Sequence, residues 1–191
     1  GIVSGTGPTA FETVRDLVTD AQMGIGQLPG QFQAAEELLI AAQKIAGNAP
    51  LKITGHSLGG SISQYLGALT GVETETFNAY GAASLRQGIP QGGDNIINHV
   101  RASDVVSAGS PHYGQVRVYA TQEDISAIQN AGDRNDRSLW DLRAPLEVAA
   151  RRALPAHELG AFIREGNGGP LMTDANRQRA EQFDPMIDKF R

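Results

Sequence analysis

The sequence predicts an α/β protein in which a mostly parallel sheet is flanked by helices. The chain of 191 residues alternates short β-branched or apolar segments with helices or long connections. This alternation is typical of parallel strands joined by crossovers. The clearest unit is a helix over Gln31–Ala46, a strand over Leu51–Thr54, and a second helix that ends at Gly71.

Each further strand has a local signal. Val72–Tyr80 contains β-branched residues and ends before a glycine, and Ile96–Arg101 is apolar and follows a turn. A strand at Gly1–Ser4 is broken by the Gly-Thr-Gly-Pro segment that follows it, and Phe11–Gln22 has a moderate helical pattern. We expect five strands, at Gly1–Ser4, Leu51–Thr54, within Val72–Tyr80, Ile96–Arg101 and Val116–Tyr119.

The strongest functional signal is the segment Gly55-His56-Ser57-Leu58-Gly59, which lies between a predicted strand and a predicted helix. The pattern G-x-S-x-G in this setting predicts a nucleophile elbow, in which a tight turn lifts the Ser57 hydroxyl clear of the sheet. The same turn directs the amide of Leu58 toward the place where an oxyanion would form. A serine in a tight turn without chemistry is the competing interpretation, and the helices on both sides of the motif disfavour it. The sequence therefore predicts an α/β-hydrolase-type fold.

Folds of this type usually have more strands than the five expected here, and the additional N-terminal strands would precede Gly1–Ser4. An unpaired edge there would be a hazard. We therefore expect an upstream segment or a second polypeptide to complete the sheet.

One α/β-hydrolase domain is expected over residues 1–191. Residues 121–156 are long, charged and poor in apolar periodicity, which indicates a surface insertion or, as the second choice, a cap over the site. Residues 170–191 are expected to form a C-terminal tail.

The composition excludes several classes of function. A net charge of -5, a pI of about 5.3 and the lack of a basic run argue against nucleic acid as a partner. The lack of cysteine excludes thiol catalysis, disulfides and thiolate metal sites. No apolar stretch approaches the roughly 20 residues of a membrane span.

A serine nucleophile needs a base, and in this fold the chain order is serine, then acid, then histidine. His56 lies inside the turn, His99 lies within a predicted strand, and His112 precedes the last strand. His157 follows every predicted strand and precedes the apolar segment Leu159–Ile163. Chain order therefore favours His157 as the base, with His112 as the alternative.

The acid should follow a strand, because functional groups gather at the carboxyl ends of strands in such sheets. Asp104 follows the Ile96–Arg101 strand, whereas Asp94 precedes it and should lie at the opposite edge. Asp124 follows the Val116–Tyr119 strand and is the second candidate. For any single aspartate in a loop, the competing role is that of a turn or cap residue.

Five segments together resemble the class 3 lipases, the α/β-hydrolase family of fungal lipases and related phospholipases. These segments are Ser4-Gly5-Thr6, Val14–Asp20, Ile53–Gly60, Phe77–Gly81 and Ser103–Val106, with His157 heading a last helix. The resemblance spans about Ser4 to Ile163. It implies an oxyanion hole formed by the Thr6 and Leu58 amides, and a mobile lid within Gly7–Gly30.

The sequence thus predicts a serine carboxylic-ester hydrolase, a lipase or phospholipase A, in which Ser57, His157 and Asp104 form a triad and an acyl-enzyme forms. A soluble esterase, thioesterase or acyltransferase would use the same residues. A non-catalytic or toxin-associated module of a larger secreted effector is the alternative of another class. No metal or organic cofactor is expected, and the partners are a lipid or other acyl-ester substrate and, transiently, a membrane surface. Secretion or delivery from a bacterium is implied by the resemblance alone.

Overall fold

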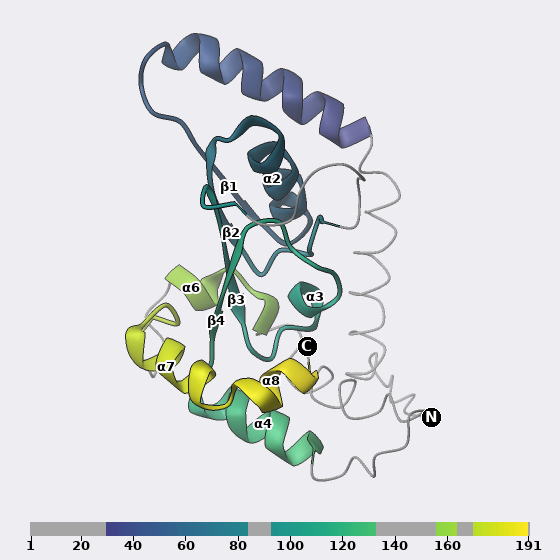
Figure 1. Ribbon diagram of the computed structural model, residues 1–191, viewed down its shortest axis with the longest axis vertical. Coiled ribbons are helices and arrows are strands. Elements are labelled where there is room, and N and C mark those ends of the chain that lie inside the picture. Colours follow the sequence, from purple (N-terminus) through teal and green to yellow (C-terminus); the bar gives the residue numbers. More distant parts are fainter. Residues whose placement is uncertain (1–29, 84–92, 133–155, 164–169, 191) are drawn as a thin grey trace, which may run out of the picture.

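The computed structural model describes residues 30–83, 93–132, 156–163 and 170–190. Four strands form one sheet in the order β1-β2-β3-β4, and all neighbouring pairs are parallel. The strands are β1 (Lys52–His56), β2 (Glu73–Phe77), β3 (Ile96–Arg101) and β4 (Gln115–Tyr119) (Figure 1). This sheet, flanked by helices, confirms the predicted α/β-hydrolase-type fold. The strand expected at Gly1–Ser4, the helix at Phe11–Gln22 and the lid region up to residue 29 lie outside the described residues.

The strand register brings the carboxyl ends of the four strands to one edge of the sheet. His56 pairs with Phe77, Phe77 pairs with His99, and Arg101 pairs with Tyr119. Residues that directly follow these strands are therefore neighbours in space although they are distant in sequence.

Helix α2 (Ser57–Thr70) covers one face of the sheet, and a helix at residues 30–46 packs against it. The Phe32 and Tyr65 rings stack with centroids 4.1 Å apart, and Leu39 and Leu66 are buried beside them. Helix α2 ends at Gly71, whose φ of 73° is the left-handed conformation that glycine adopts at helix ends. Both helices and this end agree with the periodicity in the sequence.

The opposite face of the sheet is covered near its carboxyl edge. Successive residues of a strand point to opposite faces, so Phe77 and Tyr119 lie on the face away from α2. There they pack with Phe162 of α6 (Gly160–Ile163) and with Leu171. The short segment around His157 therefore approaches the sheet from this side.

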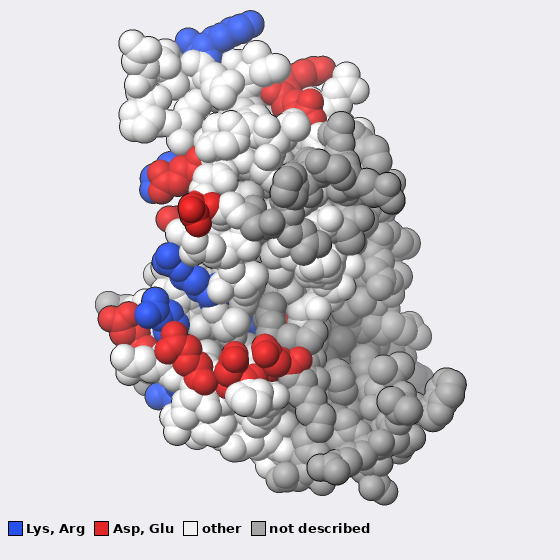
Figure 2. All heavy atoms as spheres, viewed as in Figure 1, with Lys and Arg blue, Asp and Glu red and all other residues white. Residues whose placement is uncertain are grey.

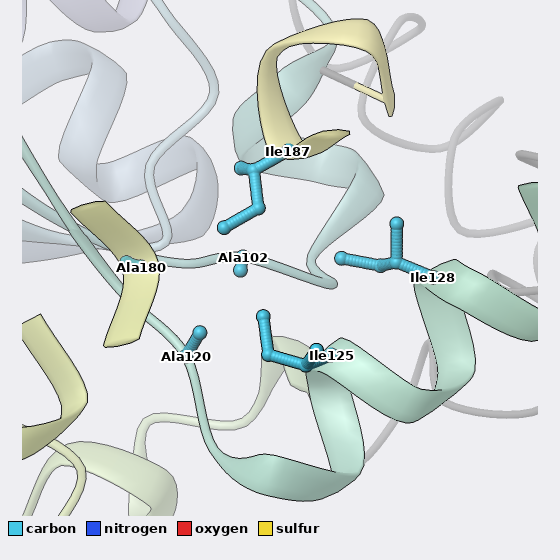
Figure 3. Packing of buried hydrophobic residues seen from close by; sticks show 6 residues of the cluster. All are labelled: Ala102, Ala120, Ile125, Ile128, Ala180 and Ile187. Atoms are coloured by element: carbon cyan, nitrogen blue, oxygen red, sulfur yellow. The ribbon is translucent and has the colours of Figure 1, made fainter. Parts of the chain in front are cut away.

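A second core lies where α4 (Gln122–Gly132), α7 (Asp174–Gln182) and α8 (Asp184–Phe190) meet the ends of β3 and β4 (Figure 1). Figure 3 shows its six buried residues, which are Ala102, Ala120, Ile125, Ile128, Ala180 and Ile187. The segment expected to be a C-terminal tail thus contributes side chains to the core. Residues 122–132, the start of the expected insertion, do so as well, and residues 133–155 lie outside the described residues.

The segment Ala102–Gly109, which follows β3 and for which the sequence predicted no helix, contains the short helix α3 (Val105–Ala108). The carboxylate of Asp104 accepts hydrogen bonds from the amides of Val106 and Ser107, at 3.3 and 3.0 Å. This N-cap satisfies amides that the first helical turn would leave unbonded, so it stabilises a helix despite two β-branched residues.

On the face shown in Figure 2, acidic side chains form a row across the lower part, in the region of α7 and α8 (Figures 1 and 2). On the face shown in Figure 2, Lys and Arg side chains lie singly or beside acidic ones. The exposed pair of Lys52 and Glu73, 2.6 Å apart on neighbouring strands, is an example. None of the helices that the structure describes has the length and apolar composition that a membrane-spanning segment requires.

Candidate active site

Ser57 directly follows β1 and is the first residue of α2. Its φ of 54° lies in the left-handed region, which is uncommon for any residue other than glycine. Two glycines permit this turn: a Cβ on Gly55 would lie 2.5 Å from the Gly59 carbonyl oxygen, and a Cβ on Gly60 would lie 2.4 Å from the Ala79 Cβ. A Cβ on Gly59 would have no atom within 4 Å. Steric crowding therefore requires glycine at positions 55 and 60, and not at Gly59, the second glycine of the motif.

The His157 side chain lies between the two other predicted residues. Its Nε2 is 2.7 Å from the Ser57 Oγ, and its Nδ1 is 3.0 Å from the Asp104 Oδ1. The imidazole is buried and Asp104 has no exposed surface. A neutral imidazole that donates from Nδ1 to a carboxylate has an unprotonated Nε2, and this nitrogen can accept the proton of the serine hydroxyl.

Asp104 is held in place by its role as the cap of α3. The two amide hydrogen bonds from Val106 and Ser107 orient the carboxylate, and the Asp104 carbonyl accepts a further bond from the Ser107 hydroxyl at 3.3 Å. Asp104 is thus a helix-cap residue and, at the same time, the neighbour of a histidine. The cap fixes the direction in which the carboxylate faces His157.

His112, the alternative base, is not near Ser57 in the hydrogen-bond network. Its Nδ1 lies 3.0 Å from the Gln64 Nε2, and its Nε2 lies 2.8 Å from the Ser107 carbonyl oxygen. The amide nitrogen can only donate and the carbonyl can only accept, so neutral His112 accepts at Nδ1 and donates at Nε2. Both ring nitrogens are therefore occupied by structural bonds.

Asp124, the alternative acid, forms an ion pair instead. Its carboxylate lies 3.0 Å from the Arg101 Nε, 2.6 Å from the Ser103 hydroxyl and 2.9 Å from the Thr121 amide. Burial alone would raise the pKa of Asp124, but the Arg101 guanidinium and these hydrogen bonds hold it below the usual value of 3.8. Reciprocal bonds between Thr121 and Asp124 form a capping box at the start of α4, a signal that is readable in the sequence.

Two side chains that the sequence analysis did not select contact the His157 segment. His56 places its Nε2 2.6 Å from the His157 carbonyl oxygen, and the Asn78 Nδ2 donates to the Ala156 carbonyl oxygen at 2.6 Å. Asn78 directly follows β2, so the strand-end criterion that selected Asp104 could have found it. Burial lowers the pKa of His56, as does the neighbouring His157, although the hydrogen bond to the carbonyl opposes this.

The predicted oxyanion donors are only partly described. The Leu58 amide lies in the first turn of α2, where amides have no acceptor within the helix. His56 is the N-cap residue of α2, and its side chain makes no cap hydrogen bond. Thr6 lies outside the described residues. Among the residues that the structure describes, no group of three or more histidine or acidic side chains could hold a metal ion.

The parallel sheet, its flanking helices and the polar groups at its carboxyl edge define an α/β protein of the hydrolase type. A family model described as the Tle-like phospholipase domain matches residues 2–173, so the chain belongs to this phospholipase-like family. Comparisons with curated proteins and with solved structures find no match. The family match confirms the expected phospholipase-like domain. It does not confirm the narrower resemblance to class 3 lipases.

Proposed function

We propose that this chain is a serine hydrolase that cleaves acyl esters of lipids, as a lipase or phospholipase A, through an acyl-enzyme. The family supports lipid esters as the general substrate class. The observation that supports the mechanism is the position of His157, whose two ring nitrogens contact Ser57 and Asp104. These contacts join residues that are 100 and 53 positions from the histidine in the sequence.

In this mechanism His157 takes the proton of the Ser57 hydroxyl as the oxygen attacks the ester carbonyl. Asp104 keeps the imidazole in the required tautomer and stabilises the imidazolium. The imidazolium then protonates the departing alcohol, and the acyl group remains on Ser57. Water, activated by the same histidine, attacks the acyl-enzyme, releases the fatty acid and restores the serine.

The negative charge that develops on the carbonyl oxygen needs donors in place before the reaction. We assign the Leu58 amide to this role because it lies in the first turn of α2 next to Ser57, with the helix dipole behind it. Such a donor contributes on the order of 3 kcal/mol to the transition state. By the resemblance to class 3 lipases, Thr6 is the second donor.

The left-handed conformation of Ser57 fits this role, because strain at a reactive residue is retained where the surrounding structure enforces it. The serine turn therefore serves as a nucleophile elbow.

The proposal is tested with the purified chain and a fluorophosphonate probe, which reacts only with an activated serine. We expect the wild type and Ser126→Ala to be labelled and Ser57→Ala to remain unlabelled. Ser126 is an exposed serine of α4 whose hydroxyl bonds the Gln122 carbonyl, so it is a matched control. Labelling of Ser57→Ala at the wild-type rate would overturn the assignment.

Substrate class is tested by mass spectrometry of the products from phospholipid vesicles, triacylglycerol emulsions and short-chain soluble esters. We expect lysophospholipid and free fatty acid from vesicles. Cleavage of soluble esters alone would indicate an esterase, and transfer of the acyl group to an added alcohol would indicate an acyltransferase. No labelling and no product would favour a non-catalytic module.

A further inference from the structure

The segment that bears His157 is short, and two hydrogen bonds from the carboxyl edge of the sheet hold its backbone. Successive carbonyls take part: the Ala156 oxygen accepts from Asn78, and the His157 oxygen accepts from His56. Ala156 and Asn78 are fully buried. Without these donors the two carbonyls would lack these bonds, and a buried acceptor that loses its hydrogen bond destabilises the fold.

Asn78 also contacts the strand that leads to Asp104. The Asn78 Oδ1 accepts a hydrogen bond from the backbone amide of Arg101 at 2.9 Å. The backbone amide of Asn78 donates to the His99 carbonyl oxygen, also at 2.9 Å. One buried side chain therefore joins the end of β3, just before Asp104, to the residue before His157. Its φ of 42° is a conformation that asparagine tolerates better than most residues.

His56, the residue that precedes Ser57, provides the second attachment to the segment that bears His157. A carbonyl only accepts, so the neutral His56 ring carries its proton on Nε2. The His56 and His157 rings lie with centroids 4.9 Å apart. Burial lowers the pKa of His56, which favours the neutral form of this ring beside His157.

We infer that Asn78 and His56 are positioning residues, a two-point clamp that sets the His157 imidazole against Ser57 and Asp104. The inference rests on the proposed function only for its effect on turnover. The hydrogen bonds of both side chains go to the backbone carbonyls of residues 156 and 157. Misplacement of a catalytic group by about 1 Å can lower a rate by about 10²-fold.

The main test replaces Asn78 in two ways. Asn78→Asp keeps the acceptor for the Arg101 amide but presents an oxygen to the Ala156 oxygen in place of the donor. Asn78→Gly keeps the left-handed backbone conformation and removes both side-chain bonds. For both variants we expect kcat to fall by up to about 10²-fold with KM unchanged, and fluorophosphonate labelling of Ser57 to slow in parallel. His56→Phe keeps a ring beside His157 and removes the donor, and we expect a smaller fall.

Asn98→Asp is the matched control. Asn98 is an equally buried asparagine of β3 whose Nδ2 donates to the Tyr113 carbonyl oxygen at 2.7 Å, away from the His157 segment. We expect this variant to lose stability as the Asn78 variants do, with kcat per folded molecule unchanged. A fall in kcat equal to that of Asn78→Asp would overturn the inference, because any buried asparagine would then have the same effect.

A second readout does not depend on activity. The proton that His157 donates to Asp104 should give a downfield resonance in the wild type and in Asn98→Asp, and this resonance should be lost in both Asn78 variants and in His157→Ala. If no ester is cleaved by any protein and the resonance follows this pattern, the proposed function fails and the clamp stands. If the wild type is active and both Asn78 variants keep the resonance and kcat, the clamp fails and the proposed function stands.

Discussion

Asp104 and Asp124 are both fully buried near the carboxyl edge of the sheet, yet their partners differ in kind. Asp124 faces the guanidinium of Arg101, which is always protonated. It also accepts hydrogen bonds from a hydroxyl and a backbone amide, which keep their protons. Asp104 faces two fixed amides and the imidazole of His157, whose Nε2 can accept a proton and release it again. The charge of Asp124 is thus balanced permanently, and that of Asp104 only when His157 is protonated.

Burial and position at a strand end are therefore not enough to identify a candidate catalytic acid. What distinguishes the two carboxylates is whether the partner can change its charge during a reaction. A carboxylate paired with arginine stabilises the fold in one state, whereas a carboxylate beside a neutral histidine favours the transfer of a proton onto that histidine.

The largest expected effect is the loss of activity in Asp104→Asn. The new amide would present a donor to His157 Nδ1 and favour the wrong tautomer, so we expect kcat on a p-nitrophenyl ester to fall by about 10⁴-fold. Asparagine caps helices about as well as aspartate, so α3 should remain and urea unfolding should change little. A larger loss of kcat in Asp124→Asn than in Asp104→Asn would reverse the roles of the two residues.

Asp124→Asn should act on stability rather than on chemistry. It removes the carboxylate that faces the largely buried Arg101 guanidinium, and breaking such a pair costs about 3–5 kcal/mol. We expect a matching fall in the urea midpoint at pH 7, with kcat per folded molecule unchanged. Unfolding curves of Asp104→Asn provide the control, and an unchanged midpoint would show that the ion pair contributes nothing.

The loss of folding stability at acidic pH provides a further test of the Asp124 ion pair. The folded pKa of Asp124 lies below 3.8, so its contribution is fully present above that value and is lost as the pH falls through the lower folded pKa. Urea unfolding from about pH 5 to pH 2 should therefore show a steeper fall for the wild type than for Asp124→Asn. Equal slopes for the two proteins would contradict the assigned direction of the shift.

The smallest expected effect is that of His112→Gln on turnover. Glutamine can still accept from Gln64 or donate toward the Ser107 carbonyl, so we expect a stability loss of about 1 kcal/mol and an unchanged kcat. Steady-state kinetics beside His157→Ala check this. A loss of kcat comparable to that of His157→Ala would mean that Asp104 serves a different histidine.

Local patterns predicted much of the fold. The Ile96–Arg101 strand has the predicted limits, and Gly71 ends α2 as expected, because both depend on the residues themselves. Helix α3 was missed because Val105 and Val106 favour strands in isolation, and only the cap by Asp104 makes the helix favourable. Strand ends correctly placed Asp104 and Asp124 at one edge of the sheet.

Which partner each side chain meets was not readable from the sequence. The direction of Asp104 depends on α3, and that of Asp124 depends on the capping box of α4 and on the packing of Ile125 and Ile128. Likewise, the interaction of Asn78 with Ala156 joins segments 78 positions apart. Periodicity and propensity describe one segment at a time and contain no information on such contacts.

The strands of the described sheet follow one another in the same order in space and in the chain, whereas the proposed base, His157, lies far beyond them in the sequence. A nascent polypeptide that has emerged through β4 holds the serine and the acid but lacks His157, which is 100 positions after Ser57. Contacts of such long separation form late, because closing the intervening loop carries an entropy cost. During synthesis or refolding, the sheet should therefore appear in circular dichroism before the ability to react with lipid esters.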